Sequence, residues 1–193
     1  MPDIVLVRHG ETEWARSGQH TSVTDIDLTE AGRQAARSLA ETLKAWTFAA
    51  ALTSPRRRAR ETCALAGLGD RARVIEDLAE WDYGEYEGLT TPQIREQRPG
   101  WSLWPDGAPG GESPCDVGSR ADRVLNELAG LDGDAVVFSH GHFLRVLAAR
   151  WLGLAPEDGR LLGTLGPACL GVLGQEREDH VVSAWNLAGT RPR

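Results

Sequence analysis

Three short apolar runs constrain the fold of this chain more than any other feature of its sequence. They span residues 4–7, 48–52 and 135–138, and none contains a charged or polar side chain. A continuous apolar run of this length is typical of a strand that is buried on both faces of a parallel sheet. We therefore expect a central sheet that is covered by other elements on both sides.

Helical periodicity marks the segments around these strands. Thr29 is placed to cap a helix with Glu30 in its first turn, and two further helical faces precede and follow the third strand. The side chains expected on the three buried faces are Ala31, Ala35, Leu39, Leu43 and Trp46; Val117, Ala121, Val124, Leu128 and Leu131; and Leu144, Leu147, Trp151 and Leu152. Alternating strands and helices predict the α/β class, as a three-layer α/β/α sandwich with a mostly parallel central sheet.

The remaining segments complete one predicted domain over residues 1–193. Apolar runs at 168–173 and 181–185 flank a polar stretch, which is typical of a hairpin at a sheet edge. Residues 98–114 are rich in proline and glycine and predict a long surface loop, in which Trp101 and Trp104 are candidates for the rim of a pocket.

Charge and cysteine content exclude several classes of function. The 193 residues carry 28 acidic and 21 basic side chains, a net charge of -7, which argues against nucleic acid and anionic membranes as partners. Three widely spaced cysteines predict free thiols rather than a disulfide framework or a zinc site. No window is apolar enough for a membrane span and the N-terminus lacks signal-peptide features, so we expect a cytoplasmic protein. No sequence feature specifies an oligomeric state.

A polar motif follows each of the three predicted strands: RHGET at residues 8–12, SPRRR at 54–58 and SHGH at 139–142. The carboxyl ends of neighbouring parallel strands face one crevice, so two histidines and at least two arginines converge there. Such a cationic pocket suits a phosphate. Arginines neutralise its oxygens, the helix N-termini expected after Gly10 and Gly141 add backbone donors, and a neutral imidazole attacks phosphorus in line.

A histidine nucleophile needs an acid that protonates the leaving oxygen, and a carboxyl group is the expected donor. Residues 78–88 contain four carboxyl side chains among aromatic residues. Spacing alone does not choose among Glu80, Asp82, Glu85 and Glu87.

Five motifs in this order resemble the histidine phosphatase superfamily, which has the phosphoglycerate-mutase-like fold. They are RHGET, the block SPRRRA at 54–59, EWDYG at 80–84 with EG at 87–88, GES at 111–113, and SHG at 139–141. The chain is most similar to small acid phosphatases and sugar-phosphate phosphatases, in which Ser-Gly-Gln-x-Thr follows the first motif, here at residues 17–21. The resemblance implies a phosphomonoesterase that acts on a small phosphorylated metabolite without a metal or other cofactor.

The resemblance also implies residue roles. His9 is the nucleophile that becomes phosphohistidine, Arg8, Arg58 and His140 bind the phosphoryl group, and Glu80 is the proton donor that later activates water. Arg58 is selected from the arginine run because the family arginine precedes a small residue and a threonine that follows four positions on.

Further side chains are expected around the substrate, namely Gln19, His20, Thr21 and Gly141. Ala15 departs from the family, because many relatives have an asparagine there that contacts the phosphate; Gln19, Thr21 or a backbone donor is the expected replacement. Arg56 and Arg57 remain open between solvated loop charges and recognition of a second anionic group.

Three alternative functions are weighed against the phosphatase. A phosphoglycerate mutase is disfavoured because the segment between Glu80 and His140 lacks the arginine-bearing insertion of such enzymes. A metal site built from His9, His140, His142 and a carboxylate is disfavoured because His140 and His142 are expected to point apart after a strand and arginines repel a cation. His142 is expected at the surface or behind the pocket, and a contact with the substrate is left open. A catalytically silent phosphate-binding module is disfavoured because both nucleophile and acid are present.

Overall fold

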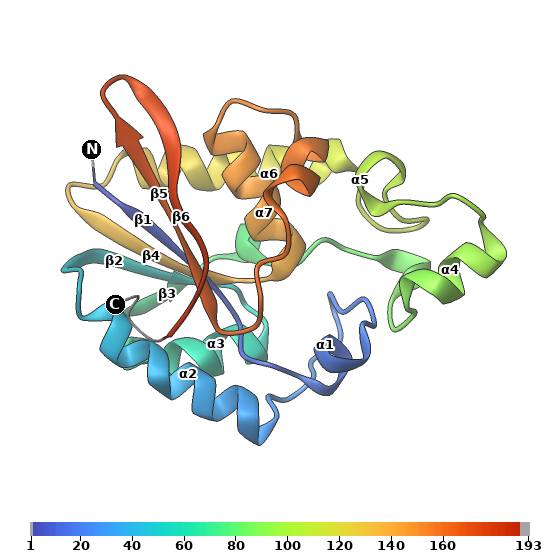
Figure 1. Cartoon of the computed structure of the whole chain (residues 1–193), viewed down its shortest axis with the longest axis horizontal. Coiled ribbons are helices and arrows are strands. Elements are labelled where there is room, and N and C mark those ends of the chain that lie inside the picture. Colours follow the sequence, from blue (N-terminus) through green and yellow to red (C-terminus); the bar gives the residue numbers. More distant parts are fainter. Residues whose placement is uncertain (1, 190–193) are drawn as a thin grey trace.

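The computed structural model describes residues 2–189 and is built around a six-stranded sheet (Figure 1). The strands are β1 (Ile4–Arg8), β2 (Phe48–Thr53), β3 (Ala72–Val74), β4 (Asp134–Ser139), β5 (Cys169–Glu176) and β6 (Asp179–Ala188), in the order β3-β2-β4-β1-β5-β6. Strands β1 to β4 pair in parallel, whereas β5 and β6 form an antiparallel edge. The mostly parallel sheet and the predicted edge hairpin are therefore confirmed.

Helices cover both faces of this sheet. Alternate side chains of β1 and β4 enter two separate apolar clusters, because successive residues of a strand point to opposite faces. Leu6 and Val137 pack with α6 (Pro114–Ala129) and α7 (Gly141–Trp151), whereas Val7 and Phe138 pack with α2 (Glu30–Leu43) and α3 (Arg57–Leu65). Figure 1 shows α6 and α7 on one side of the sheet and α2 and α3 on the other. The predicted three-layer α/β/α sandwich is confirmed.

Shorter elements lie in the connections between these layers. They are α1 (Glu13–Ser17), α4 (Thr91–Gln97), α5 (Leu103–Asp106), and the 3-10 turns η1 (Gly69–Arg71), η2 (Glu76–Leu78), η3 (Gly84–Tyr86) and η4 (Pro156–Leu162). Residues of α1 and α4 line a crevice at the carboxyl ends of the parallel strands. Across residues 2–189, no helix combines the length and apolar character that a bilayer crossing requires.

Helix α2 begins where the sequence predicts, and its predicted buried residues Leu39 and Leu43 are confirmed, but its first two turns bury other residues than predicted. The Thr29 hydroxyl accepts a 3.0 Å hydrogen bond from the Gly32 amide, which caps the helix. Gly32 and Ala36 are buried, whereas Ala31 and Ala35 are exposed. A Cβ at Gly32 would lie 2.3 Å from the Glu11 carbonyl oxygen, so this glycine allows the helix to approach the loop after β1 and fixes which face turns inward.

The prediction of a long surface loop at 98–114 is wrong in part. This segment contains α5, and its two indoles belong to the core: Trp101 is 2% exposed and Trp104 is 8% exposed. The Trp101 Nε1–H donates to the Gly107 carbonyl at 2.9 Å, which satisfies its buried polar atom. Burial of large indole rings is favourable, and it outweighs the tendency of a proline- and glycine-rich segment to stay at the surface. Neither indole forms the rim of the pocket described below.

Candidate active site

The register of the parallel strands brings the three predicted motifs together. Arg8 at the end of β1 pairs with Ser139 at the end of β4, and the His9 amide donates to the Ser139 carbonyl at 3.0 Å. On the other side of β4, the Ser54 amide donates to the Phe138 carbonyl at 2.9 Å. The loops that follow β1, β2 and β4 are therefore neighbours at one edge of the sheet, as the sequence predicts.

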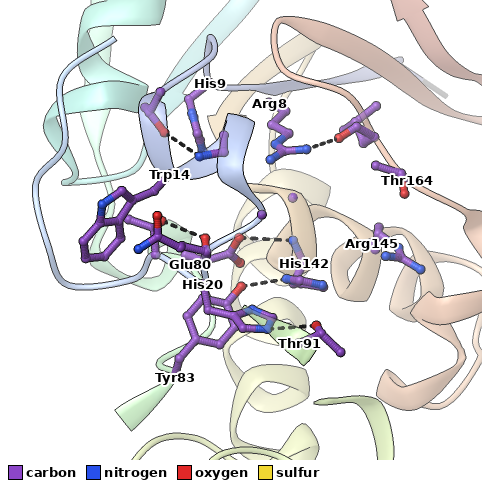
Figure 2. A pocket seen from close by; sticks show the side chains of 17 residues that line it. Arg8, His9, Trp14, His20, Glu80, Tyr83, Thr91, His142, Arg145 and Thr164 are labelled. Atoms are coloured by element: carbon purple, nitrogen blue, oxygen red, sulfur yellow. Dashed lines mark hydrogen bonds between the residues drawn. The ribbon is translucent and has the colours of Figure 1, made fainter. Parts of the chain in front are cut away.

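A cavity of about 280 Å³ opens at this edge (Figure 2). Its walls come from the loop after β1, the segment around α1, the turn before η3, the start of α7, and the loop before β5. The lining side chains and backbone include Arg8, His9, Thr12, Trp14, Ala15, Gly18, Gln19, His20, Thr21, Glu80, Tyr83, Thr91, Gly141, His142, Arg145, Thr164 and Leu165. Seven of the nine sequence-predicted site residues are among them: Arg8, His9, Gln19, His20, Thr21, Glu80 and Gly141.

His9 is held in one tautomer by its own loop. Its Nδ1 lies 2.7 Å from the Gly10 carbonyl oxygen, and because a carbonyl can only accept, Nδ1 carries the hydrogen. Nε2 then keeps its lone pair. Burial, followed by the charges of Arg58 and Arg8, holds the pKa of His9 well below its usual range, so the ring is neutral at pH 7. The site thus contains a neutral imidazole with a free nucleophilic nitrogen.

Gly10 is required by the close packing of this loop. A Cβ at this position would lie 2.7 Å from the carbonyl oxygen of Gly32 in α2. The Gly10 amide donates to the Thr62 hydroxyl of α3 at 2.9 Å, and that hydroxyl donates in turn to the Arg58 carbonyl at 2.7 Å. The carbonyl that orients His9 is therefore fixed between two helices.

Two of the predicted phosphate ligands are arginines with unsatisfied nitrogens. Arg8 donates through Nη1 to the Leu165 carbonyl at 2.7 Å, and Arg58 donates to backbone carbonyls of Thr21, Ser22 and Thr24 at 3.0 to 3.2 Å. The Nε atom of each is buried and has no hydrogen-bond partner within residues 2–189. Burial lowers the pKa of both guanidinium groups, but an arginine stays charged at neutral pH.

His140 and Arg58 lie behind the cavity wall rather than on it. Both are fully buried, and the His140 ring centroid is 5.2 Å from that of His9. His140 Nε2 is 2.7 Å from the Ser54 hydroxyl, while its buried Nδ1 has no partner in the described part of the chain. Burial and the charge of Arg58 hold the pKa of His140 well below its usual range. Three unpartnered nitrogens, on Arg8, Arg58 and His140, thus belong to the predicted phosphate-binding residues.

Glu80 differs from the other three carboxyl candidates in its position. It is 7% exposed and lines the cavity, which Asp82, Glu85 and Glu87 do not. Its Oε1 accepts from the amides of Trp81 and Phe143 at 2.9 Å, and its Oε2 accepts from the His142 amide at 3.2 Å (Figure 2). The first turn of α7 therefore orients Glu80. Among contacts within residues 2–189, the second and third amides of α7 are bound to Glu80 and the Gly141 amide remains available to a ligand, fewer amides than the sequence indicates.

Glu87 has a structural role that the sequence did not reveal. Its carboxylate accepts hydrogen bonds from the Ser22 amide and hydroxyl and from the Thr24 amide, at 2.7 to 3.0 Å. The carbonyls of this same segment hold the Arg58 guanidinium. Glu87 therefore positions Arg58 through the backbone.

The predicted substrate-binding side chains line the cavity, and some of their polar atoms are already hydrogen-bonded within the protein. Gln19 donates through Nε2 to the Gly88 carbonyl at 2.8 Å, and Thr21 donates to the Gln19 carbonyl at 3.2 Å. His20 packs 4.6 Å from the Tyr83 ring, and burial lowers its pKa to about 4. Ala15 lines the cavity, so the departure from the family pattern lies within the site.

The sequence left the position of His142 open and did not point to several other cavity residues. His142 and Tyr83 both line the cavity, and the Tyr83 hydroxyl lies 2.6 Å from His142 Nδ1 (Figure 2). Arg145, one helical turn after His142, and Thr164 were not considered. The spacing from His142 to Arg145 on one face of α7 was an available signal for the arginine, whereas Thr164 lies in an irregular loop and gave none.

The two histidines of the SHGH motif turn to different partners, as expected. His140 contacts Ser54 and His142 contacts Tyr83. Throughout residues 2–189, no group of three or more His, Cys, Asp or Glu side chains is arranged to hold a metal ion.

Comparisons with known proteins agree with this arrangement. Residues 4–188 match the model of the histidine phosphatase superfamily (branch 1). The acid phosphatase of Mycobacterium tuberculosis is 41% identical over 190 residues, covering 96% of this chain and 93% of that protein. The sedoheptulose 1,7-bisphosphatase of Saccharomyces cerevisiae is 37% identical, covering 81% of this chain and 69% of that protein.

A solved structure agrees equally well. The product of an open reading frame of Mycobacterium tuberculosis superposes with a TM-score of 0.93 at 39% identity, covering 98% of this chain and 99% of that one. The family match extends over almost the whole chain and includes every motif at the cavity. This protein therefore belongs to branch 1 of the histidine phosphatase superfamily.

Proposed function

We propose that this chain hydrolyses phosphate monoesters of small metabolites through a covalent phosphohistidine at His9. The observation that carries the proposal is the 2.7 Å contact between His9 Nδ1 and the Gly10 carbonyl, which leaves Nε2 as a nucleophile in the cavity. The acid phosphatase and bisphosphatase names of the two relatives support the same reaction class.

Phosphate binding is supported by the unpartnered nitrogens around His9. Leaving a buried donor without a partner costs about 1–3 kcal/mol, and Nε of Arg8, Nε of Arg58 and Nδ1 of His140 are all in this state. Oxygens of a phosphoryl group seated beside His9 would accept from Arg8 Nε and the Gly141 amide, which belong to the cavity lining, and from Arg58 and His140 if binding displaces the wall in front of these two side chains. The charges of the two arginines would neutralise the phosphoryl group.

The first chemical step forms the bond between His9 Nε2 and phosphorus while the bond from phosphorus to the ester oxygen breaks. Glu80, in its protonated form, gives its proton to the leaving oxygen, so the product is a neutral alcohol and Glu80 becomes a carboxylate. Its three backbone hydrogen bonds hold the carboxyl group at the cavity wall for this transfer.

The second step returns the enzyme to its starting state. The Glu80 carboxylate takes a proton from a water molecule, whose oxygen attacks phosphorus as the nitrogen–phosphorus bond breaks. The products are inorganic phosphate, neutral His9 and protonated Glu80. The cavity is open to solvent and admits this water.

We also propose a cytoplasmic location and a single functional domain. Cys63, Cys115 and Cys169 are all free, which is typical of a reducing compartment. All six strands belong to one sheet, which supports one domain.

Product analysis tests the proposed reaction. The protein is incubated with glycerol 3-phosphate or 3-phosphoglycerate, with and without EDTA, and both free phosphate and isomerised ester are measured. The proposal expects stoichiometric release of phosphate that EDTA does not change. Net isomerisation with little free phosphate would identify a mutase, loss of activity with EDTA would identify a metal hydrolase, and binding without turnover would identify a phosphate-binding module; each would overturn the proposal.

A further inference from the structure

Arg145 differs from Arg8, the other arginine of the cavity lining, because the proposed chemistry does not use it. It projects from α7 one turn after His142 and lines the cavity with His142 and Thr164. Figure 2 shows Arg145 and Thr164 on one side of His142 and Glu80 on the other. Because the reacting phosphate is assigned to His9 and Glu80, Arg145 is expected to contact another part of the ligand.

The guanidinium group of Arg145 is held in place by three contacts. Nε donates to the Gly159 carbonyl at 3.1 Å, Nη2 donates to the Arg160 carbonyl at 3.0 Å, and the group stacks 4.4 Å above the ring of Trp104. Nη1 has no hydrogen-bond partner in the described part of the chain. One nitrogen of a preorganised cation thus remains free at the cavity wall, and little side-chain entropy is lost when it binds an anion.

Arg145 also lacks a carboxylate in direct contact with its guanidinium group, within the described residues 2–189. Arg150, on the same helix, uses its Nε and Nη2 atoms to pair with the Asp122 carboxylate at 2.8 and 3.1 Å. Arg145 forms no ion pair within residues 2–189, and its corresponding atoms bind neutral carbonyls. Burial lowers its pKa, with partial compensation from the charge of Glu80. A partly buried cation without a carboxylate favours an anionic ligand.

The other arginines considered for a second anion are placed less well. Arg57 is 64% exposed and pairs with Asp27 at 3.0 Å, and neither Arg56 nor Arg57 lines the cavity. Arg8 lies at the reacting end beside His9 and Gly141, as a Cβ at Gly141 would be 3.3 Å from its guanidinium carbon. Arg145 is therefore the remaining arginine of the cavity lining.

We propose that Arg145 binds a second anionic group of the substrate, so that the substrate class is a phosphate ester that also carries a phosphate or a carboxylate. This inference rests on the proposed phosphatase function and narrows it. The reacting phosphate is held beside His9, and the second anion accepts hydrogen bonds from Arg145 Nη1, with the Thr164 hydroxyl beside it as a further donor.

Matched pairs of esters test this inference. 3-Phosphoglycerate differs from glycerol 3-phosphate by a carboxylate in place of a hydroxymethyl group, and fructose 1,6-bisphosphate differs from fructose 6-phosphate by a second phosphate. We expect kcat/KM for at least one doubly anionic ester to exceed that of its partner by about tenfold to hundredfold, the range for a charged hydrogen bond. The pair that shows the preference identifies the second anion as carboxylate or phosphate.

Variants assign this preference to the arginine. Arg145→Gln should reduce the ratio of kcat/KM values toward one, mainly through KM, and Arg145→Lys should retain part of it because it keeps the charge. Arg150→Gln, the matched control on the same helix, should leave the ratio unchanged. If wild type hydrolyses all four esters with no preference, or if both Arg145 variants lose activity equally on both members of a pair, the inference is overturned while the phosphatase stands. If wild type hydrolyses none of them, the phosphatase proposal itself fails.

Discussion

Nδ1 of His9 donates to the carbonyl oxygen of the next residue, Gly10, at 2.7 Å, and this contact determines what the ring can do. The hydrogen is fixed on Nδ1, so Nε2 is the nitrogen that can form a bond to phosphorus. The Gly10 carbonyl is itself held in place because α2 packs against Gly10 too closely for any side chain. The reactive atom is thus set by backbone geometry that only glycine permits.

The position of Glu80 predicts a dependence on the leaving group. Glu80→Gln keeps the size of the side chain but has no proton to give, so we expect turnover of an alkyl phosphate to fall by about 100- to 10,000-fold. Turnover of p-nitrophenyl phosphate, whose leaving group needs little protonation, should fall far less. Steady-state kcat values for both esters are compared with those of Glu85→Gln, an exposed carboxyl outside the cavity. Equal losses on the two esters would remove Glu80 from the donor role.

Ser54 is expected to set the tautomer of His140. Its hydroxyl oxygen already accepts from the Arg56 amide at 3.2 Å, so its hydrogen is available to His140 Nε2 at 2.7 Å. The proton of His140 then lies on Nδ1, the atom without a partner. Ser54→Ala should lower kcat/KM by about threefold to tenfold, the value of one neutral hydrogen bond.

Two further variants separate this role from a loss of packing. Ser54→Thr retains the hydroxyl and should recover activity, and the control Ser38→Ala removes an exposed hydroxyl that donates to the Gln34 carbonyl of its own helix. Nitrogen NMR of the imidazoles should find the proton of His140 on Nδ1 in wild type. A proton on Nε2, or full activity in Ser54→Ala, would contradict the assignment.

The contacts of Glu87 predict that its substitution lowers both the stability of the protein and its affinity for phosphate. Glu87→Gln weakens the charge-assisted bonds to Ser22 and Thr24, each worth about 1.5–3 kcal/mol, and loosens the carbonyls that hold Arg58. We expect a lower melting temperature and a higher inhibition constant for inorganic phosphate. Thermal unfolding and phosphate inhibition are measured beside Glu85→Gln, which should match wild type. A destabilised Glu87→Gln protein with unchanged phosphate affinity would show that the segment does not position Arg58.

The buried His20 predicts that stability falls in mild acid. Burial lowers its folded-state pKa to about 4 from an ordinary value of 6.5, so the unfolded chain binds the proton more readily between these values. The free energy of unfolding therefore falls as the pH drops from 6.5 toward 4, because protonation of His20 favours the unfolded chain. The total loss from this residue is about 3 kcal/mol. Urea unfolding across this range should give a shallower pH slope for His20→Phe than for wild type. The buried rings of His9, His140 and His142 titrate in both proteins, so identical slopes would contradict the assignment to His20.

Much of the fold, and the meeting of the three motifs at one edge of the sheet, could be predicted from the sequence because both depend on local patterns. Buried runs end at the sheet edge, so the motifs after β1, β2 and β4 had to meet there, and Glu80 followed from the family resemblance. The residues that the first turns of α2 bury were not predictable, since they depend on how closely Gly32 approaches Glu11. Periodicity alone cannot detect such an approach.

The remaining errors have one physical cause: they involve contacts between segments that are irregular in the chain. Glu87 reaches Arg58 only through the backbone of residues 21–24, and Arg145 is aligned by carbonyls of η4. The composition of 98–114 indicated a loop, while its two indoles are buried against the helices. None of these contacts has a spacing that a single sequence reveals.

The central claim is that His9 carries the phosphoryl group, and trapping this intermediate tests it most directly. Wild-type protein is mixed with a phosphomonoester labelled on phosphorus, quenched within milliseconds in alkali, and digested for peptide mapping. We expect label on the peptide that contains His9, stable in alkali and released by acid, and no label in His9→Ala. Turnover of the ester without any acid-labile label, or label that persists in His9→Ala, would contradict the account.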